Sequence, residues 1–511
     1  MSVDDPVQGT ERTVPAPADA APDSAPEPAP AEGETRDQDA ADAPAEGRPG
    51  GWSALRPLVL RLHFYAGLLI APFLLVAAVT GLLYAASIQI EKVVYADELT
   101  VPVGESAVPL ARQVEAALDA HPDGKLTAVW PSAEDGATTR VLLSAPGVEE
   151  GKSLAVFVDP YTAEVRGSLE SYGSSGALPF RAWVSELHRH LHLGEPGRVY
   201  SELAASWLWA VALGGLLLWL GRRRAARGRG GARGLLLPER GATGRRRTLS
   251  WHGAVGIWAF LGLLFLSATG LTWSTYAGAN IDVLRSELRG ATPAIDSALD
   301  GGKAAAGHGD HAGGHGGTGD EGRDKGPDIG LDQVHEIAAG RKLTGSPVEI
   351  TVPTEPGTAY VVKQTDKQWP VHLDAMAVHP GTGEVTDELR FADHPLLAQL
   401  TRYGIDAHMG LTFGLANQLV LMGISLGLIL LIVWGYVMWW QRRPTKSRRR
   451  GVGRPMPRGA WRRVPLPVLL PLLAVTAVVG WFVPLLGISL VAFLAVDVVL
   501  GAVRRRGAAA A

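Results

Sequence analysis

Cysteine is absent from this sequence of 511 residues. This absence excludes disulfide bonds, iron–sulfur clusters, thiolate zinc sites and the covalent CxxCH attachment of haem. A redox cofactor in this protein would therefore be held by histidine, methionine or carboxylate side chains.

Large apolar residues are nearly absent from residues 1–50, which are rich in Ala, Pro, Asp and Glu. Such a segment cannot bury enough apolar surface to fold, so it is predicted to be a disordered cytoplasmic tail. It also lacks the basic start and the short apolar stretch of a cleaved signal peptide. The first apolar run that follows is therefore expected to be a retained membrane anchor.

Hydrophobic residues make up 47% of the sequence and gather in long runs. Runs of about 20 residues cross a hydrocarbon core of roughly 30 Å. Such runs lie near residues 64–87, 201–220, 253–275 and 418–440, and a tighter pair, near 464–482 and 485–503, is separated by Pro484. The sequence predicts six membrane spans, with a re-entrant hairpin as the alternative for the last pair. Asp497, inside the final run, is expected to pair across this hairpin or to face lipid.

Positive charge is segregated along the chain, although the formal net charge is only −3. Arginine and lysine cluster in residues 221–250, 441–463 and 504–511. Cytoplasmic loops carry such an excess of basic residues, so both termini are expected to be cytoplasmic in a protein of the plasma (inner) membrane. Because membrane topology accounts for the basic stretches, no nucleic-acid partner is predicted.

The second half of the sequence repeats the first half. The matching positions are His63 with His252, Gly67 with Gly256, Thr80-Gly81 with Thr269-Gly270, and His188 with His408. The offset between matching positions grows after the first span, which places an insert at about 290–326 in the second half. Each half is interpreted as span, outer segment, span. The two halves are expected to be related by an axis along the membrane normal.

The segments between the paired spans, residues 91–187 and 276–407, are predicted to be small extracytoplasmic α+β domains. Each begins with a helical pattern, PLARQVEAALDA in the first half and DQVHEIAAG in the second, and continues with strand-like runs. Both halves then contain a strand and a turn of the pattern (D/H)P-x-T-x-E-V, which is VDPYTAEV at 158–165 and VHPGTGEV at 378–385. This turn is interpreted as structural.

A helix, strands and this turn, placed between membrane spans, resemble the PepSY domain, and residues 55–443 resemble the PepSY-associated transmembrane family. The most specific features are H-x3-G-x12-TG at the start of each half and a histidine before each closing span. Together with the repeat, the resemblance implies an internally duplicated α-helical membrane protein with two extracytoplasmic α+β PepSY-like domains. The family includes iron-regulated membrane proteins and haem-containing ferric-siderophore reductases.

The complete domain order follows from the spans, the repeat and the basic loops. The predicted segments are a disordered cytoplasmic tail (1–50), a first span (51–90), a first PepSY-like domain (91–187), a second span (188–220), a basic cytoplasmic loop (221–250), a third span (251–275), a second PepSY-like domain (276–407) with a Gly/His-rich insert at about 290–326, a fourth span (408–440), a second basic loop (441–463), a transmembrane hairpin (464–503) and a cytoplasmic tail (504–511).

Histidines at the ends of the apolar runs are the candidate site residues, because ionisable side chains in membranes are rare and usually functional. His63 and His252 lie near the cytoplasmic ends of equivalent runs, whereas His188 and His408 lie on the outer side. Facing imidazoles ligate the iron of a b-type haem from both sides, an arrangement suited to electron transfer. His63 is about 24 residues, roughly 36 Å of helix, from the outer end of its span, so two haems at different depths are predicted.

The outer histidine of the first half is ambiguous. The stretch LHRHLHLG offers His188, His190 and His192; the register of the repeat favours His188, and His192 is the second candidate. A membrane-edge histidine also has a structural interpretation, in which it hydrogen-bonds a neighbouring carbonyl or lies among headgroups. The recurrence of equivalent positions in both halves favours haem ligation.

Three further histidines, His308, His311 and His315, lie in the glycine-rich stretch GHGDHAGGHGG. His-rich tracts often bind metal, so this stretch is interpreted either as a hydrophilic linker or as a weak site for Cu(II), Zn(II) or Ni(II). Because the insert has no counterpart in the first half, it is separate from the predicted haem sites.

The leading functional hypothesis is transmembrane electron transfer through two bis-histidine b-type haems, which reduces ferric iron or a ferric siderophore outside the membrane. No dinucleotide-binding fingerprint, a G-x-G-x-x-G that follows a strand and opens a helix, and no recognisable flavin module is seen, so the electron donor is expected to be a separate cytoplasmic partner or the quinone pool. The first alternative is a PepSY-type binding or regulatory protein that acts on an extracytoplasmic peptide or peptidase. The second is a metal or siderophore transporter, which the near absence of acidic and amide side chains at mid-depth disfavours.

Overall fold

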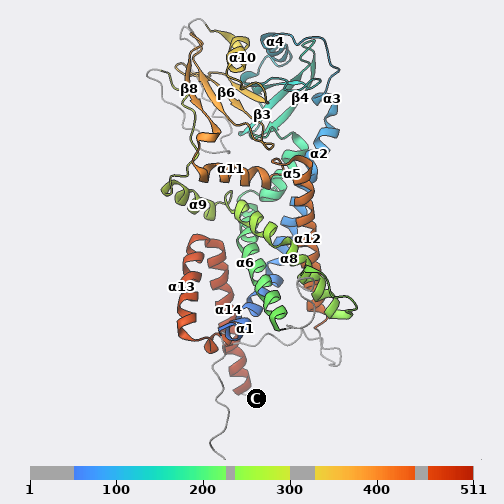
Figure 1. Cartoon of the computed structure of the whole chain (residues 1–511), viewed down its shortest axis with the longest axis vertical. Helices are drawn as coiled ribbons and strands as arrows, with labels where there is room; N and C mark the ends of the chain where they lie inside the picture. The colour runs from blue at the N-terminus through green and yellow to red at the C-terminus, as the bar shows by residue number, and fades with distance from the viewer. Residues whose placement is uncertain (1–50, 226–235, 300–327, 443–458, 510–511) are drawn as a thin grey trace, which may run out of the picture. The chain divides into compact units, whose positions relative to one another are not determined.

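The computed structural model describes residues 51–225, 236–299, 328–442 and 459–509 (Figure 1). The predicted tail (1–50) and most of the predicted insert lie outside these ranges. The first half contains α1 (Gly51–Leu69), α2 (Ala71–Val94), α3 (Ala96–Leu99), α4 (Leu110–Ala120), β1 (Lys125–Trp130), β2 (Thr139–Ser144), β3 (Lys152–Val158), β4 (Val165–Tyr172), α5 (Pro179–His190) and α6 (Glu195–Ala225).

The second half follows a similar order of elements. It contains α8 (Gly244–Leu271), α9 (Tyr276–Glu287), α10 (Gly330–Gly340), β5 (Val348–Thr351), β6 (Tyr360–Gln364), β7 (Ala375–Val378), β8 (Val385–Leu389), η1 (Phe391–Asp393), α11 (Leu396–His408) and α12 (Gly414–Trp440). The chain then continues through η2 (Ala460–Arg463), α13 (Leu466–Phe482) and α14 (Pro484–Ala509). In both halves, four strands are preceded by a short amphipathic helix and followed by two helices.

Long apolar helices make this a membrane-spanning protein. Within the described ranges, 5 helices are long and apolar enough to cross a bilayer: α2, α6, α8, α12 and α14. The predicted span near 464–482 corresponds to α13, which has 17 residues. Its length of roughly 26 Å is below the thickness of the hydrocarbon core. The prediction of six spans therefore corresponds to five long helices and one shorter helix, which packs against α14.

The first predicted span, near 64–87, is divided between α1 and α2 at Ile70. Pro72 stands at the start of α2, where its missing N–H costs no helical hydrogen bond. The same proline inside a continuous helix would remove such a bond and clash with the preceding turn. His63 consequently lies on α1, whereas the rest of the predicted span forms α2.

The strands of both halves form one antiparallel sheet in the order β4-β3-β2-β1-β5-β6-β7-β8. The sequence predicts two separate domains, whereas the structure joins their strands where β1 pairs with β5, with Ala128 opposite Thr351 and Val129 opposite Ile350. Each half alone would expose the backbone groups of one of these strands at a sheet edge. The pairing of β1 with β5 provides hydrogen-bond partners for the backbone groups at both edges.

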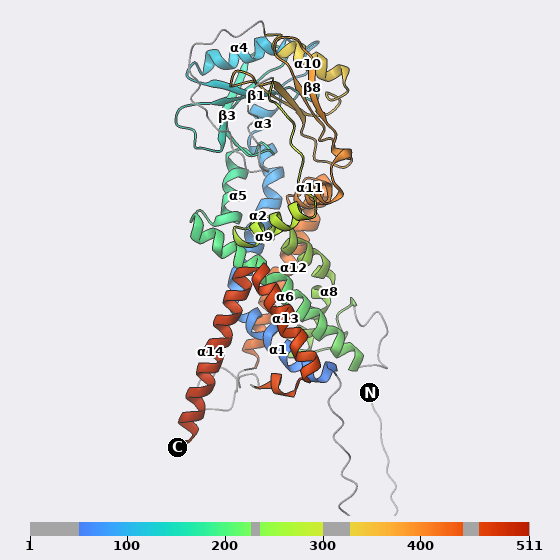
Figure 2. The ribbon, with the colours of Figure 1, turned by 90° about the vertical axis from the view of Figure 1, so that its left-hand side faces the viewer.

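One face of the sheet is covered by α4 and α10 (Figure 2). The core between the helices and the sheet contains the fully buried side chains Val129, Val141, Val156, Ile350, Val362 and Met376. The two halves are also linked across the helices, because the Asp332 carboxylate of α10 accepts hydrogen bonds from the backbone N–H groups of Leu110 (2.6 Å) and Ala111 (3.3 Å) at the start of α4. A carboxylate at this helix end satisfies amides that have no intrahelical partner.

A buried ion pair connects α2 with α5. The Glu91 carboxylate accepts hydrogen bonds from Arg181 Nε at 3.0 Å and from the backbone N–H of Leu178 at 2.8 Å. Both charged side chains are less than 10% exposed, at 6% for Arg181 and 8% for Glu91. Arg140 of β2 lies nearby, and burial lowers its pKa to about 10, an effect that Glu91 opposes and Arg181 reinforces. This cluster fixes the C-terminal end of α2 against α5, close to Arg140 of the sheet.

The C-terminal helices are anchored to the preceding helices by polar contacts. Trp207 Nε1 of α6 donates to Ser489 Oγ of α14 at 2.8 Å. Asp497 forms an ion pair with Arg61 of α1, with 2.5 Å between a carboxylate oxygen and a guanidinium nitrogen. The sequence suggested pairing across the hairpin or exposure to lipid, and the structure shows a third arrangement. A basic partner offsets the cost of the carboxylate in an apolar helix.

Candidate functional site

His63 of α1 and His252 of α8 face one another. Their ring centroids are 6.4 Å apart and their planes are inclined by 78°. His63 Nδ1 is 2.9 Å from the backbone oxygen of Val211 in α6, and His252 Nδ1 is 3.1 Å from that of Leu431 in α12. Because a carbonyl oxygen only accepts, the proton of each ring lies on Nδ1. Each Nε2 therefore carries a lone pair.

Glycines allow the close approach of His63 to α6. A Cβ atom on Gly215 would lie 3.0 Å from His63 Cε1, and one on Gly214 would lie 3.5 Å from His63 Cβ. Gly67, in contrast, has open space where a side chain would begin, and a Cβ on Gly256 would only contact Leu431 at 3.7 Å. Room therefore exists beside the inner histidines at Gly67, whereas Gly214 and Gly215 position the ring.

His188 of α5 and His408 of α11 form the second pair. His188 Nδ1 is 2.8 Å from Thr80 Oγ1 of α2, and His408 Nδ1 is 2.6 Å from Thr269 Oγ1 of α8. Each threonine sits one residue before a glycine of the repeated Thr-Gly motif. The two histidines are thus held by equivalent hydroxyl groups in the two halves.

The threonine hydroxyls also determine the tautomers of the outer histidines. Thr80 Oγ1 donates to the backbone oxygen of Val76 at 2.8 Å, and Thr269 Oγ1 donates to that of Phe265 at 2.7 Å. A hydroxyl group has one proton, and here it is donated to the backbone oxygen. The hydroxyl oxygen therefore accepts a hydrogen bond from the imidazole N–H. His188 and His408 are therefore protonated on Nδ1, like the inner pair. Within the described ranges, none of the four Nε2 atoms makes a hydrogen bond.

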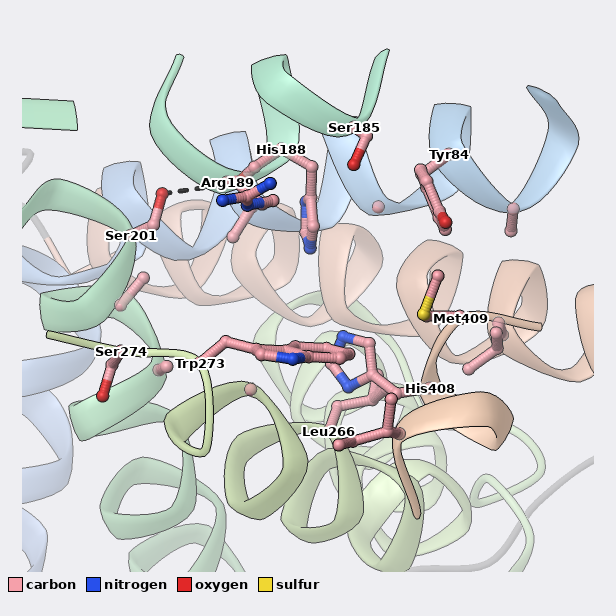
Figure 3. A pocket seen from close by; sticks show the side chains of 18 of the residues that line it. Tyr84, Ser185, His188, Arg189, Ser201, Leu266, Trp273, Ser274, His408 and Met409 are labelled. Atoms are coloured by element: carbon pink, nitrogen blue, oxygen red, sulfur yellow. Dashed lines mark hydrogen bonds between the residues drawn. The ribbon is translucent and has the colours of Figure 1, made fainter. Parts of the chain in front are cut away.

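His188 and His408 enter one cavity of about 280 Å³ from different sides (Figure 3). Apolar side chains make up much of its lining, among them Leu74, Leu208, Leu263, Leu421 and Leu428. Gly81 and Gly270 lie beside the two rings, and a Cβ on Gly81 would approach His188 Cε1 to 3.2 Å. Trp273 also lines the cavity, with its ring 5.4 Å from that of His408. The cavity is therefore a largely apolar space with two imidazoles directed into it.

The donor set fits bis-histidine ligation of haem. Two imidazoles on one metal, with metal–nitrogen bonds of about 2.0 Å, have ring centroids roughly 6 Å apart. The inner rings match this separation at 6.4 Å. The outer rings share an apolar cavity, and neutral imidazoles with free Nε2 lone pairs are the ligands that haem iron accepts. A second hydrogen bond from the other ring nitrogen, as seen here, is a regular feature of metal-binding histidines.

His192, the second candidate from the sequence, lies elsewhere. Its ring stacks on Trp183 with centroids 5.0 Å apart, and its Nδ1 is 3.3 Å from the Glu186 carboxylate. It is not among the residues that line the cavity. His308, His311 and His315 lie outside the described residues. In the part of the chain that is described, no group of three or more His, Cys, Asp or Glu residues is arranged to hold a metal ion.

The hydroxyl partners of the outer histidines were not identified from the sequence, which favoured close packing for Thr80-Gly81 and Thr269-Gly270. One signal was available, because each Thr-Gly pair stands at a fixed distance after an inner histidine in both halves. A polar residue repeated inside an apolar run indicates a partner for its hydroxyl group. The basic residues that line the cavity gave no comparable signal, because they come from separate elements: Arg189, Arg198, Lys367 and Arg402.

Comparison with protein families identifies the family of the chain. No curated protein matches the chain. The model of the PepSY-associated TM region matches residues 60–442, a range that includes both histidine pairs, both hydroxyl partners and the whole sheet. The match agrees with the resemblance seen in the sequence. The chain therefore belongs to the PepSY-associated transmembrane family.

Proposed function

We propose that this protein transfers electrons across the membrane through two bis-histidine b-type haems and reduces ferric iron or a ferric siderophore on the outer side. The observation that carries the proposal is the common arrangement of His63, His252, His188 and His408: in each, Nδ1–H is bound to a protein oxygen and Nε2 is left with a lone pair. Each haem, when bound, supplies an iron centre that accepts and releases one electron.

The protein's contribution is to hold the imidazoles in a fixed tautomer and orientation. Backbone oxygens on α6 and α12 do this for the inner pair, and threonine hydroxyls on α2 and α8 do it for the outer pair. Hydrogen bonding of Nδ1 raises the basicity of Nε2 and lowers the entropy lost when it binds a metal. The leucines that line the outer cavity would limit the access of water to the ligands.

The chain's two halves contribute equally to the proposed sites, which supports an origin by duplication. Each pair takes one histidine from each half, while each hydrogen bond to Nδ1 is formed within one half. The basic stretches 221–250, 441–463 and 504–511 support a topology with both termini in the cytoplasm of a plasma (inner) membrane protein. The proposed donor is a cytoplasmic protein or a membrane quinone.

A second candidate function is the binding of an extracytoplasmic peptide. The observation that favours it is the position of β8 at one end of the sheet order, where an extended peptide can add as a further strand. This function requires neither histidine pair. Substitution of His63 and His252 by alanine would leave it unchanged but would abolish the proposed electron transfer.

Electron transfer is tested in proteoliposomes with dithionite trapped inside and ferric citrate and ferrozine outside. The expected result is Fe(II)–ferrozine formation well above that of protein-free liposomes. His188→Ala and His408→Ala should return the rate to this background, whereas His192→Ala should leave it unchanged. Equal rates in the wild type and His408→Ala would contradict the proposal.

A further inference from the structure

The helix α11 has an exposed apolar face on the side away from the outer cavity. Leu396 and Leu400 are 70% and 56% exposed. Tyr403 and Ala407, both half-buried, continue this face at helical spacing. The opposite face of α11 contributes Ile405 to the lining of the outer cavity. The helix therefore separates the outer cavity from a second, apolar surface.

A groove of about 320 Å³ lies along this apolar face. We call it the lateral groove. Residues of α8, the β6–β7 connection, α11 and the segment before α12 line it, among them Phe265, Trp369, Leu400, Tyr403, Ala407 and Phe413. Two of the aromatic side chains, Trp369 and Phe413, are 61% and 60% exposed. The lateral groove is thus an aromatic and aliphatic surface that lacks a cover within the described residues.

The groove is built by defined contacts between these elements. The backbone N–H of Trp369 donates to the backbone oxygen of Thr412 at 2.8 Å, which joins the β6–β7 connection to the segment before α12. The Trp369 and Tyr403 rings have centroids 5.7 Å apart. A Cβ atom on Gly404 would lie 3.2 Å from Thr269 Cγ2, so this glycine allows α11 to approach α8 closely.

An exposed apolar stripe on α8 leads to the lateral groove. Trp258 and Leu261 are 69% and 75% exposed, and Phe265, which lines the groove, follows on the same helical face. The helix α8 is one of those long and apolar enough to cross a bilayer. Exposed apolar side chains on such a helix face lipid, so the groove continues a lipid-facing surface.

A second stripe reaches the groove along α12. Phe413 lines the groove and immediately precedes this helix, which is also long and apolar enough to cross a bilayer. The exposed side chains on one face of α12 are Leu415, Leu419, Leu426, Leu430 and Val433. The lipid-facing stripes of two membrane helices therefore converge on the lateral groove.

The equivalent surface of the first half is polar instead. Trp183 of α5 stands 220 residues before Tyr403, the offset of the repeat, and is 54% exposed. The His192 ring stacks on it with centroids 5.0 Å apart. Glu186 lies 3.3 Å from His192 and 3.7 Å from Lys152. Charged and polar side chains thus surround this position in the first half, and the apolar groove is a property of the second half.

The chemistry of the lining favours hydrocarbon over a protein partner. Partner proteins typically form several hydrogen bonds across an interface. The described residues that line the groove offer two polar side chains, Tyr403 and Thr412, and no charged one. Contiguous exposed apolar surface of this kind marks a site of membrane or protein contact, and Trp and Tyr side chains are enriched where a membrane meets water.

We propose that acyl chains of the membrane leaflet next to the sheet fill the lateral groove, so that α11 lies in the membrane interface. The occupant is bilayer lipid because the groove continues the lipid-facing stripes of α8 and α12. The helix that carries His408 is then packed between lipid on one face and the outer cavity on the other. This inference goes beyond the proposed function and requires no bound haem.

The test uses single cysteines, which the cysteine-free chain makes specific. Leu400→Cys and Phe413→Cys place a nitroxide label at the groove in the full-length protein, reconstituted in phosphatidylcholine vesicles. Leu426→Cys on α12 is the reference for lipid, and Glu115→Cys on α4 is the reference for water. Trp183→Cys, at the repeat position of Tyr403, is the matched control. Power-saturation EPR measures collisions of each label with oxygen, which concentrates in hydrocarbon, and with nickel EDDA, which stays in water.

Labels at Leu400→Cys and Phe413→Cys should resemble the label at Leu426→Cys. The ratio of oxygen to nickel collisions is expected to be several-fold higher there than at Glu115→Cys and Trp183→Cys. Both groove positions are exposed, so the substitutions are compatible with folding.

Two results would overturn the proposal. A label at Leu400→Cys that collides with nickel EDDA as often as that at Glu115→Cys would place the groove in water. A label that is shielded from both reagents would show that a second copy of the chain or another protein covers the groove. Haem content has no part in either readout, so a failure of the proposed function would leave this test intact.

Discussion

Each of the four paired histidines donates its Nδ1–H to an oxygen on a neighbouring helix, but the oxygens differ between the pairs. The inner pair uses backbone carbonyls, which no substitution removes. The outer pair uses the hydroxyls of Thr80 and Thr269. The outer histidines therefore offer a direct way to test what the hydrogen bond to Nδ1 contributes.

Replacement of Thr80 by valine keeps the size of the side chain but removes the acceptor for His188. We expect a 10- to 100-fold weaker affinity for hemin, because the imidazole loses its fixed tautomer and orientation. Thr269→Val should have the same effect through His408. The affinities are measured by titration of the haem-free protein.

Two variants serve as controls for this experiment. Thr80→Ser retains the hydroxyl and should retain the affinity. Thr248→Val alters a threonine of α8 whose hydroxyl donates to the backbone oxygen of Gly244 in its own helix, so it should have no effect. Unchanged affinity in both Thr80→Val and Thr269→Val would rule out this positioning role.

Alanine substitution of a single inner histidine should remove one haem and retain the other. His63→Ala leaves His252 without its facing imidazole, while the hydrogen bonds of His188 and His408 are formed by other residues. The haem content per chain, measured as pyridine haemochrome, is expected to fall by half. His192→Ala should keep the full haem content. A full haem content in His63→Ala together with a halved content in His192→Ala would contradict the assignment of His63 as a ligand.

At the scale of elements, α2 joins the cavity to the sheet. Thr80 and Glu91 are 11 positions apart in the sequence, which is about three helical turns, so they lie on nearly the same face. One contacts His188 of α5 and the other contacts Arg181 of α5. The ion pair of Glu91 therefore fixes the helix pair that positions the outer histidine.

Glu91→Gln should destabilise the protein strongly. Removal of the carboxylate leaves Arg181 buried without its anionic partner, which costs about 3–5 kcal/mol. We expect a clearly lower midpoint of thermal unfolding in detergent. Glu115→Gln breaks the exposed pair with Arg112, worth about 0–1 kcal/mol, and should leave the midpoint nearly unchanged. Similar midpoints for the two variants would show that the buried pair is unimportant.

At the scale of the whole molecule, the two halves meet both in the sheet and at the histidine pairs. The sheet is continuous through β1 and β5, and each histidine pair takes one ring from each half. Neither half alone contains a complete pair. The proposed sites therefore depend on the association of the halves, and the sheet contributes to that association.

The absence of cysteine makes the membrane topology easy to test. A single Glu115→Cys variant places a thiol on α4 beside the sheet, and Thr243→Cys places one between α6 and α8, within the basic stretch 221–250. An impermeant maleimide should label Glu115→Cys in intact cells and Thr243→Cys only after the membrane is opened. The reverse labelling pattern would invert the proposed orientation.

The sequence predicted those features that depend on the repeat. A constant offset aligns His63 with His252, and the register of the repeat favours His188 over His192. The joined sheet was not predictable in this way, because the pairing of β1 with β5 links residues far apart in the chain. The role of Thr80 depends on how α2 and α5 are rotated toward one another, which periodicity does not define. The break before α2, in contrast, has a signal in the sequence, because Pro72 lies inside the first predicted span.

The haem content of the purified protein tests the central claim most directly. The full-length chain is expressed with adequate haem supply, purified in detergent, and examined by its absorption spectrum before and after dithionite and by the pyridine haemochrome assay. We predict a Soret band, a b-type reduced spectrum and about two haems per chain. A folded protein that shows no Soret band and no haem would contradict the account.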